Sequence, residues 1–412
     1  MVQLRDYQAE IVNKATELLR SYRWCYLAME VRTGKTLTSL SIAEAVGGLD
    51  NVLFITKKKA IGSITSDGDM LCPSYSLFVI NYESLHRLPK VKWDLIIVDE
   101  AHSMGAFPKP SKRAKDVREL IVKNDPYVIL LSGTPTPESY SQIYHQVYGI
   151  RRNPFADLKN FYAFARVYVN ATQKRLGTHT VTDYSGGKDT IVTDMQPYTI
   201  AYTQAEAGFV SKINEHFIEV EMLPETYHLC KLLKDNRVIE DYAGGDILAD
   251  TAVKLMQKTH QICSGTVKLE CGETVMIDAS KAEAIYGRFK DEKIGIFYKF
   301  VGELTLLKRV YGEQLTTDLE EFDATDKSIA LQIISGREGI SLRKASSLVY
   351  YNIDFSATSY WQSRDRMTTK DRVSSEVYWV FSRGGIERAI YNAVSKKKDY
   401  TLRHFKRDVL SL

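Results

Sequence analysis

The sequence has few cysteines, and their arrangement excludes a disulfide framework. The 412 residues include five cysteines, an odd number, and no Cys-x-x-Cys pair. His260, Cys263 and Cys271 could be imagined as three metal ligands, but their spacing matches no standard zinc site. We therefore expect buried thiols and a surface histidine at these positions.

Long hydrophobic runs and an excess of one charge are also missing. No apolar stretch reaches the length of a membrane span, and the first residues, MVQLRDYQAE, lack the basic end and apolar run of a signal peptide. We expect a cytoplasmic protein that does not bind a membrane. The 55 basic and 51 acidic residues leave a net charge of +4, so any nucleic-acid surface must be a local basic patch.

The length and the hydrophobic pattern predict two domains. A chain of this length is too long for one ordinary core. In the first half, apolar strand-like runs alternate with helical patterns, which is typical of a parallel sheet covered on both faces. These runs are CYLAM, NVLFIT, LFVINY, DLIIVDE and YVILLSG. The runs in the second half are KIGIFYKF, SIALQIIS, SLVYYNID and EVYWVFS, with a helix that contains LTLLKRVY. We predict an α/β fold with two parallel-sheet domains in tandem, residues 1–222 and 223–412.

The stretch MEVRTGKTLTSL at residues 29–40 contains part of a phosphate-binding loop. The full pattern is Gly, four residues and then Gly-Lys-Ser/Thr, and here Met29 replaces the first glycine. Gly34 still allows the backbone to approach a phosphate, Lys35 supplies a positive charge, and Thr36 can ligate Mg²⁺. The apolar run before the loop predicts a strand, and TLTSLSIAEAV after it predicts a helix. The alternative is a chance Gly-Lys-Thr in a surface turn.

A pair of acids follows the apolar strand in DLIIVDEAHS. Asp99 and Glu100 have the chemistry that nucleotide hydrolysis needs, because one carboxylate can hold magnesium while the other polarises the attacking water. An isolated Asp-Glu pair is often only a solvated strand end, but this pair follows the Gly-Lys-Thr in the right order and fold context, which favours a function. His102 comes next, at a spacing that lets it face the opposite domain.

Six short motifs occur along the chain in a fixed order. They are LRDYQ at 4–8, RTGKT at 32–36, DEAH at 99–102, SGTPT at 132–136, IISGREGISL at 333–342 and YWQSRDRM at 360–367. The order resembles that of superfamily 2 DEAH-box helicases, and the chain is most similar to Swi/Snf-type DNA translocases and to compact bacteriophage helicases. The resemblance implies two RecA-like domains that bind ATP in the cleft between them and nucleic acid across both.

The resemblance also implies a role for each matching residue. The residues implied in catalysis are Lys35, Asp99, Glu100 and Arg366, and the Mg²⁺ ligands are Thr36 and Asp99. The ATP-binding residues are Arg5, Gln8, Arg32, Thr33, Gly34, Lys35, Thr36, Gly339, Gln362 and Arg366. The residues that would couple the ATP site to the DNA site are His102, Ser132 and Thr134. The expected DNA contacts are Lys57, Lys58, Asn81, Tyr82, Lys299, Ser335 and Arg337. An alternative for the lysines at 57–59 is an ordinary solvated basic loop.

The sequence departs from the family pattern at two places. Arg32 stands where many relatives have glycine, a variation that the family tolerates. The second arginine of the sixth motif should fall at Thr369. Arg366 could act alone in hydrolysis, or a nearby basic residue could substitute. The candidates are Arg364, Lys370 and Arg372.

An insertion rich in aromatic and basic residues is predicted on the first domain, at about residues 144–215. It could stack on unpaired bases or wedge a duplex open. The alternative is that its aromatic side chains pack as ordinary helix core. A basic tail of helical pattern, YNAVSKKKDYTLRHFKRDVL, lies near the end of the second domain and could touch DNA, a partner or its own domain.

Together these motifs imply an ATP-dependent DNA helicase or double-strand DNA translocase. The similarity to phage helicases suggests a monomer that acts in DNA replication, recombination or repair in the host bacterial cytoplasm, with phage or host proteins as further partners. An RNA helicase belongs to the same class, but these motifs resemble the DNA-directed branch more. Two other hypotheses are a nucleic-acid-binding or recruitment module with a weakened ATPase, and the motor subunit of a restriction or repair complex.

Overall fold

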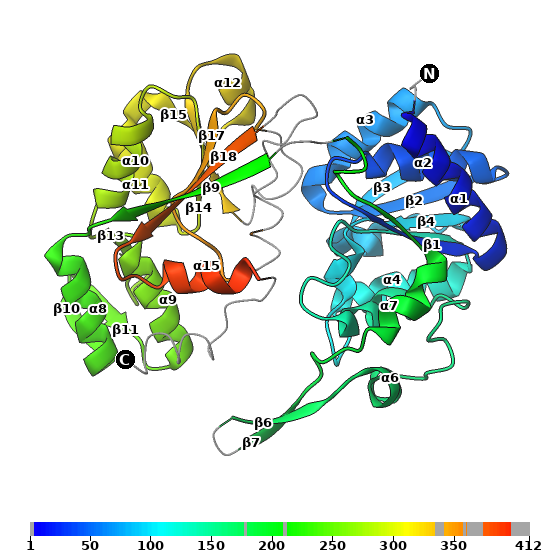
Figure 1. Cartoon of the computed structure of the whole chain (residues 1–412), viewed down its shortest axis with the longest axis horizontal. Helices are drawn as coiled ribbons and strands as arrows, with labels where there is room; N and C mark the ends of the chain where they lie inside the picture. The colour runs from blue at the N-terminus through cyan, green and yellow to red at the C-terminus, as the bar shows by residue number, and fades with distance from the viewer. Residues whose placement is uncertain are drawn as a thin grey trace. The chain divides into compact units, whose positions relative to one another are not determined.

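The structure, a computed structural model, describes residues 4–176, 179–208, 212–333, 342–356, 360 and 374–396. The chain divides into two compact units, Met1–Gly208 and Phe209–Leu412. Each unit contains a six-stranded sheet whose neighbouring strands are all parallel (Figure 1). The predicted α/β fold with two parallel sheets in tandem is therefore confirmed. Among the described helices, none is both long and apolar enough to cross a lipid bilayer.

The sheet of the first unit has the strand order β3-β2-β4-β5-β1-β8. Its strands are β1 (Trp24–Met29), β2 (Asn51–Thr56), β3 (Ser76–Asn81), β4 (Leu95–Val98), β5 (Tyr127–Leu131) and β8 (Thr199–Tyr202). The central strands are apolar at almost every position because helices cover both faces of the sheet. The helices over one face are α1 (Asp6–Tyr22), α2 (Lys35–Val46) and α3 (Ile61–Leu71). Those over the other face are α4 (Lys112–Asn124), α5 (Ile143–Val147), α6 (Phe161–Tyr168) and α7 (Thr190–Met195).

The aromatic insertion belongs largely to the core of the first unit. Tyr144, Phe155, Phe161 and Phe164 are buried in the cluster that packs against the sheet, so these rings are not available to stack on bases. The core alternative therefore describes them correctly. Between α6 and α7 the segment forms an antiparallel hairpin of β6 (Thr172–Leu176) and β7 (His179–Asp183), which extends away from the unit in Figure 1. The insertion ends before residue 215, because β8 returns to pair with β1.

The sheet of the second unit has the order β15-β16-β14-β17-β18-β9. Its strands are β9 (Lys212–Val220), β14 (Gly295–Tyr298), β15 (Leu315–Thr316), β16 (Ser328–Gln332), β17 (Ser347–Tyr350) and β18 (Ser374–Ser382). The helices that pack with one core cluster are α8 (Pro224–Asn236), α9 (Ala252–Cys263), α12 (Leu319–Ala324) and α15 (Glu387–Val394). Those of the other cluster are α10 (Ser280–Phe289) and α11 (Val301–Tyr311). The α11 helix contains LTLLKRVY, as predicted.

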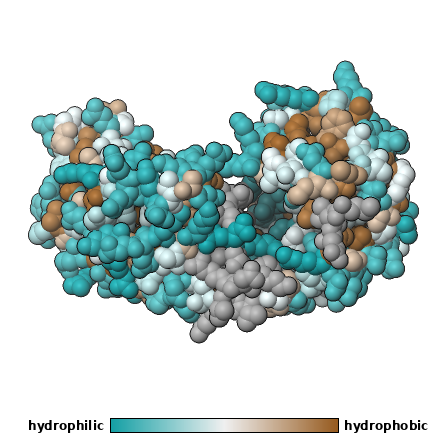
Figure 2. All heavy atoms as spheres, turned by 90° about the horizontal axis from the view of Figure 1, so that it is seen from above, coloured by the Kyte–Doolittle hydropathy of each residue, from teal (hydrophilic) through white to brown (hydrophobic). Residues whose placement is uncertain are grey.

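Short elements complete the two units. Two antiparallel hairpins of the second unit are formed by β10 (Val238–Tyr242) with β11 (Gly245–Leu248) and by β12 (Thr266–Lys268) with β13 (Thr274–Met276). The short 3-10 helices are η1 (Lys58–Ala60), η2 (Tyr82–Arg87), η3 (Ala101–Met104), η4 (Tyr140–Gln142), η5 (Gln196–Tyr198) and η6 (Gly312–Gln314). On the face seen in Figure 2, hydrophilic residues cover most of the surface of each unit, as expected where the cores are enclosed.

The boundary between the units lies earlier than the predicted boundary after residue 222. Strand β9 pairs with β18 along nine residues, from the pair Lys212 and Ser374 to the pair Val220 and Ser382. Residues 212–220 therefore belong to the second unit, and the first unit ends at Gly208. The prediction was wrong here because KINEHFIEV mixes charged and apolar residues and so lacks the apolar run that indicates a buried strand.

Candidate nucleotide site

The predicted site residues of the first unit meet at the carboxyl edge of its sheet. Strands β1, β2, β4 and β5 are neighbours and run parallel. The candidate phosphate loop, residues 30–34, follows β1, and Asp99 and Ser132 follow β4 and β5. Thr56 ends β2 at the same edge. Ligands bind at this edge in open parallel sheets, so the topology itself brings together motifs that are distant in sequence.

The candidate phosphate loop keeps its shape without the full set of glycines. Met29 is fully buried as the last residue of β1, where an apolar side chain is needed more than a glycine. Gly34 caps helix α2 with a φ of 81°, and a Cβ atom there would lie 2.4 Å from Gln8 Nε2. Arg32 adopts a φ of 64°, the left-handed conformation that favours glycine, which fits its place at a family glycine position. The loop therefore opens onto the N-terminus of α2, whose first amides have no partner within the helix.

Gln8 holds the loop from helix α1. Its side-chain amide is 5% exposed, accepts the Arg5 amide at 3.0 Å, and donates to the Gly34 carbonyl at 3.4 Å and to Thr38 Oγ1 at 3.2 Å. The structure thus brings Arg5, Gln8 and Gly34 together, as the resemblance implied. Thr33 is also buried, and its hydroxyl donates to the Glu30 carbonyl at 2.8 Å.

Lys35 begins α2 and reaches back over the loop. Its Nζ donates to the carbonyls of Met29 at 3.1 Å and Glu30 at 3.3 Å. A Cβ atom on Gly133, in the SGTPT motif, would lie 3.6 Å from this amine, so the two motifs pack closely. The Lys35 charge also lies near enough to Asp99 to lower the pKa of that carboxyl.

Asp99 is held at two points. Thr56 donates its hydroxyl to Asp99 Oδ2 at 2.8 Å, and the Tyr82 hydroxyl donates to the Asp99 backbone carbonyl. Burial and the charge of the neighbouring Glu100 raise the pKa of Asp99 to about 6, although Lys35, the Thr56 hydrogen bond and Lys57 oppose this rise. The charged form of this carboxyl is therefore disfavoured, and a nearby cation would stabilise it.

We expect Asp99→Asn to stabilise the metal-free chain at neutral pH. The folded state binds the Asp99 proton more tightly than the unfolded state does. The free energy of unfolding therefore falls as the pH rises from about 4 to about 6, and above pH 6 this loss stays constant. The variant should gain on the order of 1–3 kcal/mol at pH 7 and nothing at pH 4. Urea unfolding in EDTA at both pH values measures this, with Asp69→Asn on the surface of α3 as the control. A gain that is equal at both pH values would contradict the assignment.

Glu100, His102 and Ser132 form a second contact group. Glu100 has a φ of 52°, a conformation that is costly for a non-glycine residue and that often occurs at functional sites. His102 Nδ1 lies 3.2 Å from Glu100 Oε2 and 2.9 Å from Ser132 Oγ, and Ser132 Oγ accepts the Thr134 amide at 3.1 Å. His102 was expected to face the other domain, but these contacts lie within the first unit. They join the DEAH and SGTPT motifs directly.

The predicted DNA contacts of the first unit differ in exposure. Lys58 is exposed and Lys57 is half-buried where β2 ends, so both remain candidates. Asn81 Nδ2 donates to Glu83 Oε2 at 3.0 Å. Tyr82 is only 2% exposed and its hydroxyl donates to the Asp99 carbonyl, so the ring is not available for the predicted DNA contact. The resemblance implied this contact from sequence position alone, and sequence position does not show that the Tyr82 side chain is buried in the core.

Lys299 occupies the corresponding carboxyl edge in the second unit. Its Nζ pairs with Asp354 at 2.7 Å and lies 3.8 Å from the centre of the Phe355 ring. A DNA phosphate would therefore have to replace Asp354 as the partner of this amine, which the sequence did not indicate. Five other predicted residues, Ser335, Arg337, Gly339, Gln362 and Arg366, lie outside the described residues, as does the tail from residue 397.

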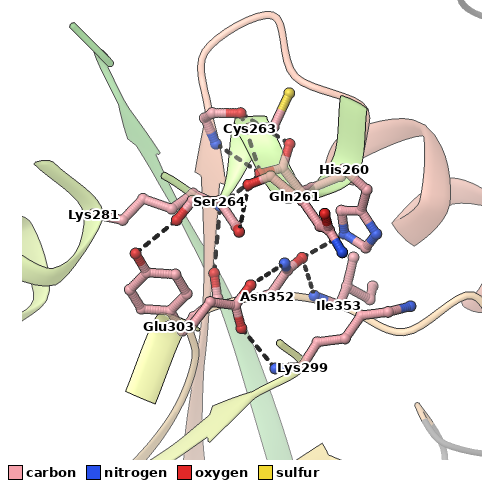
Figure 3. Close-up of polar contacts among 12 residues, drawn as sticks. His260, Gln261, Cys263, Ser264, Lys281, Lys299, Glu303, Asn352 and Ile353 are labelled. Atoms are coloured by element: carbon pink, nitrogen blue, oxygen red, sulfur yellow. Dashed lines mark hydrogen bonds and ion pairs between the residues drawn. The ribbon is translucent and has the colours of Figure 1, made fainter. Parts of the chain in front are cut away.

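A buried polar network supports this edge (Figure 3). His260 Nε2 contacts Asn352 Oδ1 at 2.5 Å, and Asn352 Nδ2 donates to Glu303 Oε1 at 2.5 Å. His260 is completely buried, so the expectation of a surface histidine is wrong, and burial lowers its pKa. Cys263 is buried and Cys271 is exposed. No cluster of three or more potential metal ligands is found in the part of the chain that the structure describes.

Thr56 is a site residue that the sequence analysis missed. It is completely buried and bonded to Asp99, which makes it part of the acid site. A signal was available, because Thr56 is the polar residue that ends the apolar run NVLFIT, and such positions line the carboxyl edge of a parallel sheet.

Comparison with known proteins gives a family. Two solved structures, the Sulfolobus solfataricus SWI2/SNF2 ATPase core in complex with dsDNA and the Sulfolobus solfataricus SWI2/SNF2 ATPase core domain, match with TM-scores of 0.44 and 0.43 at 17% identity. The matches cover 100% of this chain and 93% and 91% of those chains, and they are too distant to assign a function. No curated protein sequence matches significantly. The sequence profile of the SNF2-related domain matches residues 46–264, more than half of the chain. The chain therefore belongs to the SNF2-related domain family.

Proposed function

We propose that this protein is an ATP-dependent DNA translocase or helicase that couples ATP hydrolysis to movement along DNA. One observation carries the proposal: Lys35, Asp99 and Glu100 converge at the carboxyl edge of a parallel sheet, with the Lys35 charge acting on Asp99. Membership of the SNF2-related domain family agrees with this chemistry.

The groups at this edge fit a nucleotide and Mg²⁺. The amides at the start of α2 and the Lys35 amine would hold the phosphates. Gln8 would recognise adenine after its amide gives up its bonds to Gly34 and Thr38, since an amide can donate and accept at once. Thr36 and Asp99 would hold Mg²⁺, which neutralises phosphate charge when bound. To bind a phosphate, Lys35 would give up its hydrogen bonds to the Met29 and Glu30 carbonyls and donate to phosphate oxygens instead. Arg32, Thr33, Gly339 and Gln362 are further proposed contacts of the nucleotide.

Hydrolysis is assigned to Glu100 as the general base. Its carboxylate would polarise the attacking water, and the contact with His102 holds the carboxylate in place. His102 also contacts Ser132, so a change at the acid pair reaches the SGTPT motif. The Thr134 hydroxyl is buried and has no hydrogen-bond partner among the described residues, which leaves it able to take one when the site changes. Arg366 from the second unit is proposed to stabilise charge in the transition state.

DNA is proposed to bind through two lysines beside the site and through the second unit. Lys57 and Lys58 supply positive charge at the end of β2. Lys299, Ser335 and Arg337 are the proposed contacts of the second unit, with Lys299 leaving Asp354 when it binds. We further propose a monomer that acts in the cytoplasm, in phage DNA replication, recombination or repair. This role rests on the resemblance to compact phage helicases.

The steady-state ATPase rate tests the proposal. It is measured without nucleic acid and with single-stranded DNA, duplex DNA, forked DNA or RNA, and Lys35→Ala provides the blank. We expect strong stimulation by DNA and little by RNA. A rate at blank level with every nucleic acid would contradict the proposal. It would favour a binding or recruitment module instead, for which Thr369 in place of the second arginine is the motivating observation.

A further inference from the structure

The last segment of the first unit is bonded to the candidate phosphate loop. The Glu30 amide donates to the Tyr202 carbonyl at 2.9 Å, where β8 ends. Two residues further on, the Gln204 amide donates to Glu30 Oε2 at 2.7 Å, and Gln204 Nε2 donates to the Val31 carbonyl at 2.9 Å. The first bond continues the sheet, but the two bonds of Gln204 lie beyond the last strand pair and are not needed for the sheet.

An aromatic pair strengthens this attachment. The rings of Tyr7 and Tyr202 stack with their centres 4.6 Å apart and an angle of 14° between their planes. The Tyr7 hydroxyl donates to the Thr33 carbonyl at 3.0 Å. The backbone of the loop is thus contacted at Val31 by Gln204 and at Thr33 by Tyr7.

The attached segment is a closed turn. Thr203 donates its amide and its hydroxyl to Glu206 Oε2 at 2.7 and 2.8 Å, and the Tyr202 hydroxyl donates to the Glu206 carbonyl at 3.0 Å. The amides of Ala207 and Gly208 close the turn by donating to the Thr203 and Ala205 carbonyls at 3.1 and 3.0 Å. The first unit ends at Gly208, so this turn is where the chain leaves for the second unit.

Glu30 connects the turn to the amine that would bind phosphate. Its carbonyl accepts Lys35 Nζ at 3.3 Å and the Thr33 hydroxyl at 2.8 Å, while its carboxylate accepts the Gln204 amide. When Lys35 turns to a phosphate, the Glu30 carbonyl loses a charged donor and the bonds around Glu30 must readjust. Gln204 bonds to Glu30 and to Val31, so a readjustment at Glu30 changes the bonds of Gln204 directly.

We propose that Gln204, through Glu30 and Val31, couples phosphate binding at Lys35 to the turn at residues 203–208 that leads into the second unit. Gln204 is a positioning residue that contacts neither nucleotide nor DNA. The inference rests on the proposed function, because it requires a nucleotide at the candidate phosphate loop. It adds a route by which nucleotide binding acts on the connection between the units.

Amide hydrogen exchange of the full chain tests the coupling. Exchange at residues 203–208 is measured with and without a non-hydrolysable ATP analogue and Mg²⁺, in the unchanged chain and in Gln204→Leu. In the unchanged chain, the analogue should alter exchange at the Ala207 and Gly208 amides by at least about fivefold, the lower end of ordinary allosteric coupling. Gln204→Leu removes the bond to Val31 but keeps the backbone bond to Glu30, so this change should be smaller in that variant. In the double variant Glu30→Ala with Gln204→Leu, which removes both bonds, the change should disappear while the analogue still binds. Gln173→Leu, an exposed glutamine of the β6 hairpin, is the matched control and should behave like the unchanged chain.

The outcomes separate this inference from the proposed function. If the analogue binds the unchanged chain and exchange at 203–208 stays the same, the coupling is wrong and the proposed function is untouched. If Gln204→Leu loses binding as completely as Lys35→Ala, Gln204 only shapes the loop, and the coupling is again wrong. If the analogue does not bind the unchanged chain at all, the coupling and the proposed function are both contradicted. A lower ratio of DNA-stimulated to basal ATPase rate in Gln204→Leu, with the ratio unchanged in Gln173→Leu, would add support.

Discussion

Glu100→Gln is expected to lower kcat for ATP hydrolysis by about 10²- to 10⁴-fold, the usual contribution of a general base. The amide keeps the shape of the carboxylate but cannot take a proton from water. The left-handed backbone at this position and the neighbouring His102 can accommodate either side chain, so folding and nucleotide binding should be retained. Single-turnover hydrolysis, together with direct binding of a fluorescent ATP analogue, measures the two effects separately.

The control for this variant is Glu119→Gln, which makes the same chemical change on the exposed surface of α4. It should hydrolyse ATP at the rate of the unchanged chain. The assignment of Glu100 fails if its variant retains normal kcat, or if it loses activity only because nucleotide binding is lost. In the second case Glu100 would shape the site rather than act on water.

Glu387→Gln is expected to lower the free energy of unfolding of the second unit by about 3–5 kcal/mol, because it leaves a buried charge without its partner. Lys281 Nζ donates to Glu387 Oε1 at 2.5 Å, and both side chains are 0% exposed. Lys281 also donates to the Tyr351 carbonyl at 3.3 Å. Tyr351 directly precedes Asn352, a residue of the network in Figure 3. The pair therefore joins α10 and α15 to the segment that follows β17.

Urea unfolding monitored by hydrogen exchange of second-unit peptides measures this loss. The control is Asp250→Asn, which breaks an exposed pair with Lys254 whose side chains are 49% and 40% exposed. Such a surface pair contributes about 1 kcal/mol or less. The double change Lys281→Met with Glu387→Leu should recover much of the stability, since it removes both charges. If Glu387→Gln and Asp250→Asn lower the free energy of unfolding equally, the buried pair contributes no more to stability than the exposed pair does.

Apolar runs predicted the central strands well because a parallel strand covered on both faces must be apolar at every position. NVLFIT and SLVYYNID contain β2 and β17 for this reason. The same signal is weak at sheet edges, where one side meets solvent. β8 and β9 were not predicted, since TIAY is short and KINEHFIEV carries two acids and a histidine. The unit boundary was misplaced as a direct consequence.

The site was predictable wherever one residue type is chemically required. Lys35, Asp99 and Glu100 lie at one sheet edge as expected. The contacts that hold these three side chains could not be predicted from the sequence. Thr56 and Tyr82 hold Asp99 from β2 and η2, and their roles depend on which strands are neighbours. Sequence order does not give that adjacency, because β2 and β4 are separated along the chain by β3.

The pairing of β9 with β18 has a consequence for biosynthesis. They are the first and last strands of this sheet along the chain, and bonded side chains such as Asn214 and Glu376 are 162 residues apart. During synthesis at roughly 5–20 residues per second, β9 would wait on the order of 10–30 s on the ribosome before its partner exists. Val220, which is buried in the folded unit, stays without its partner strand for that time. The nascent second unit is therefore expected to be a client of ribosome-associated chaperones, while the first unit can fold as soon as β8 has emerged.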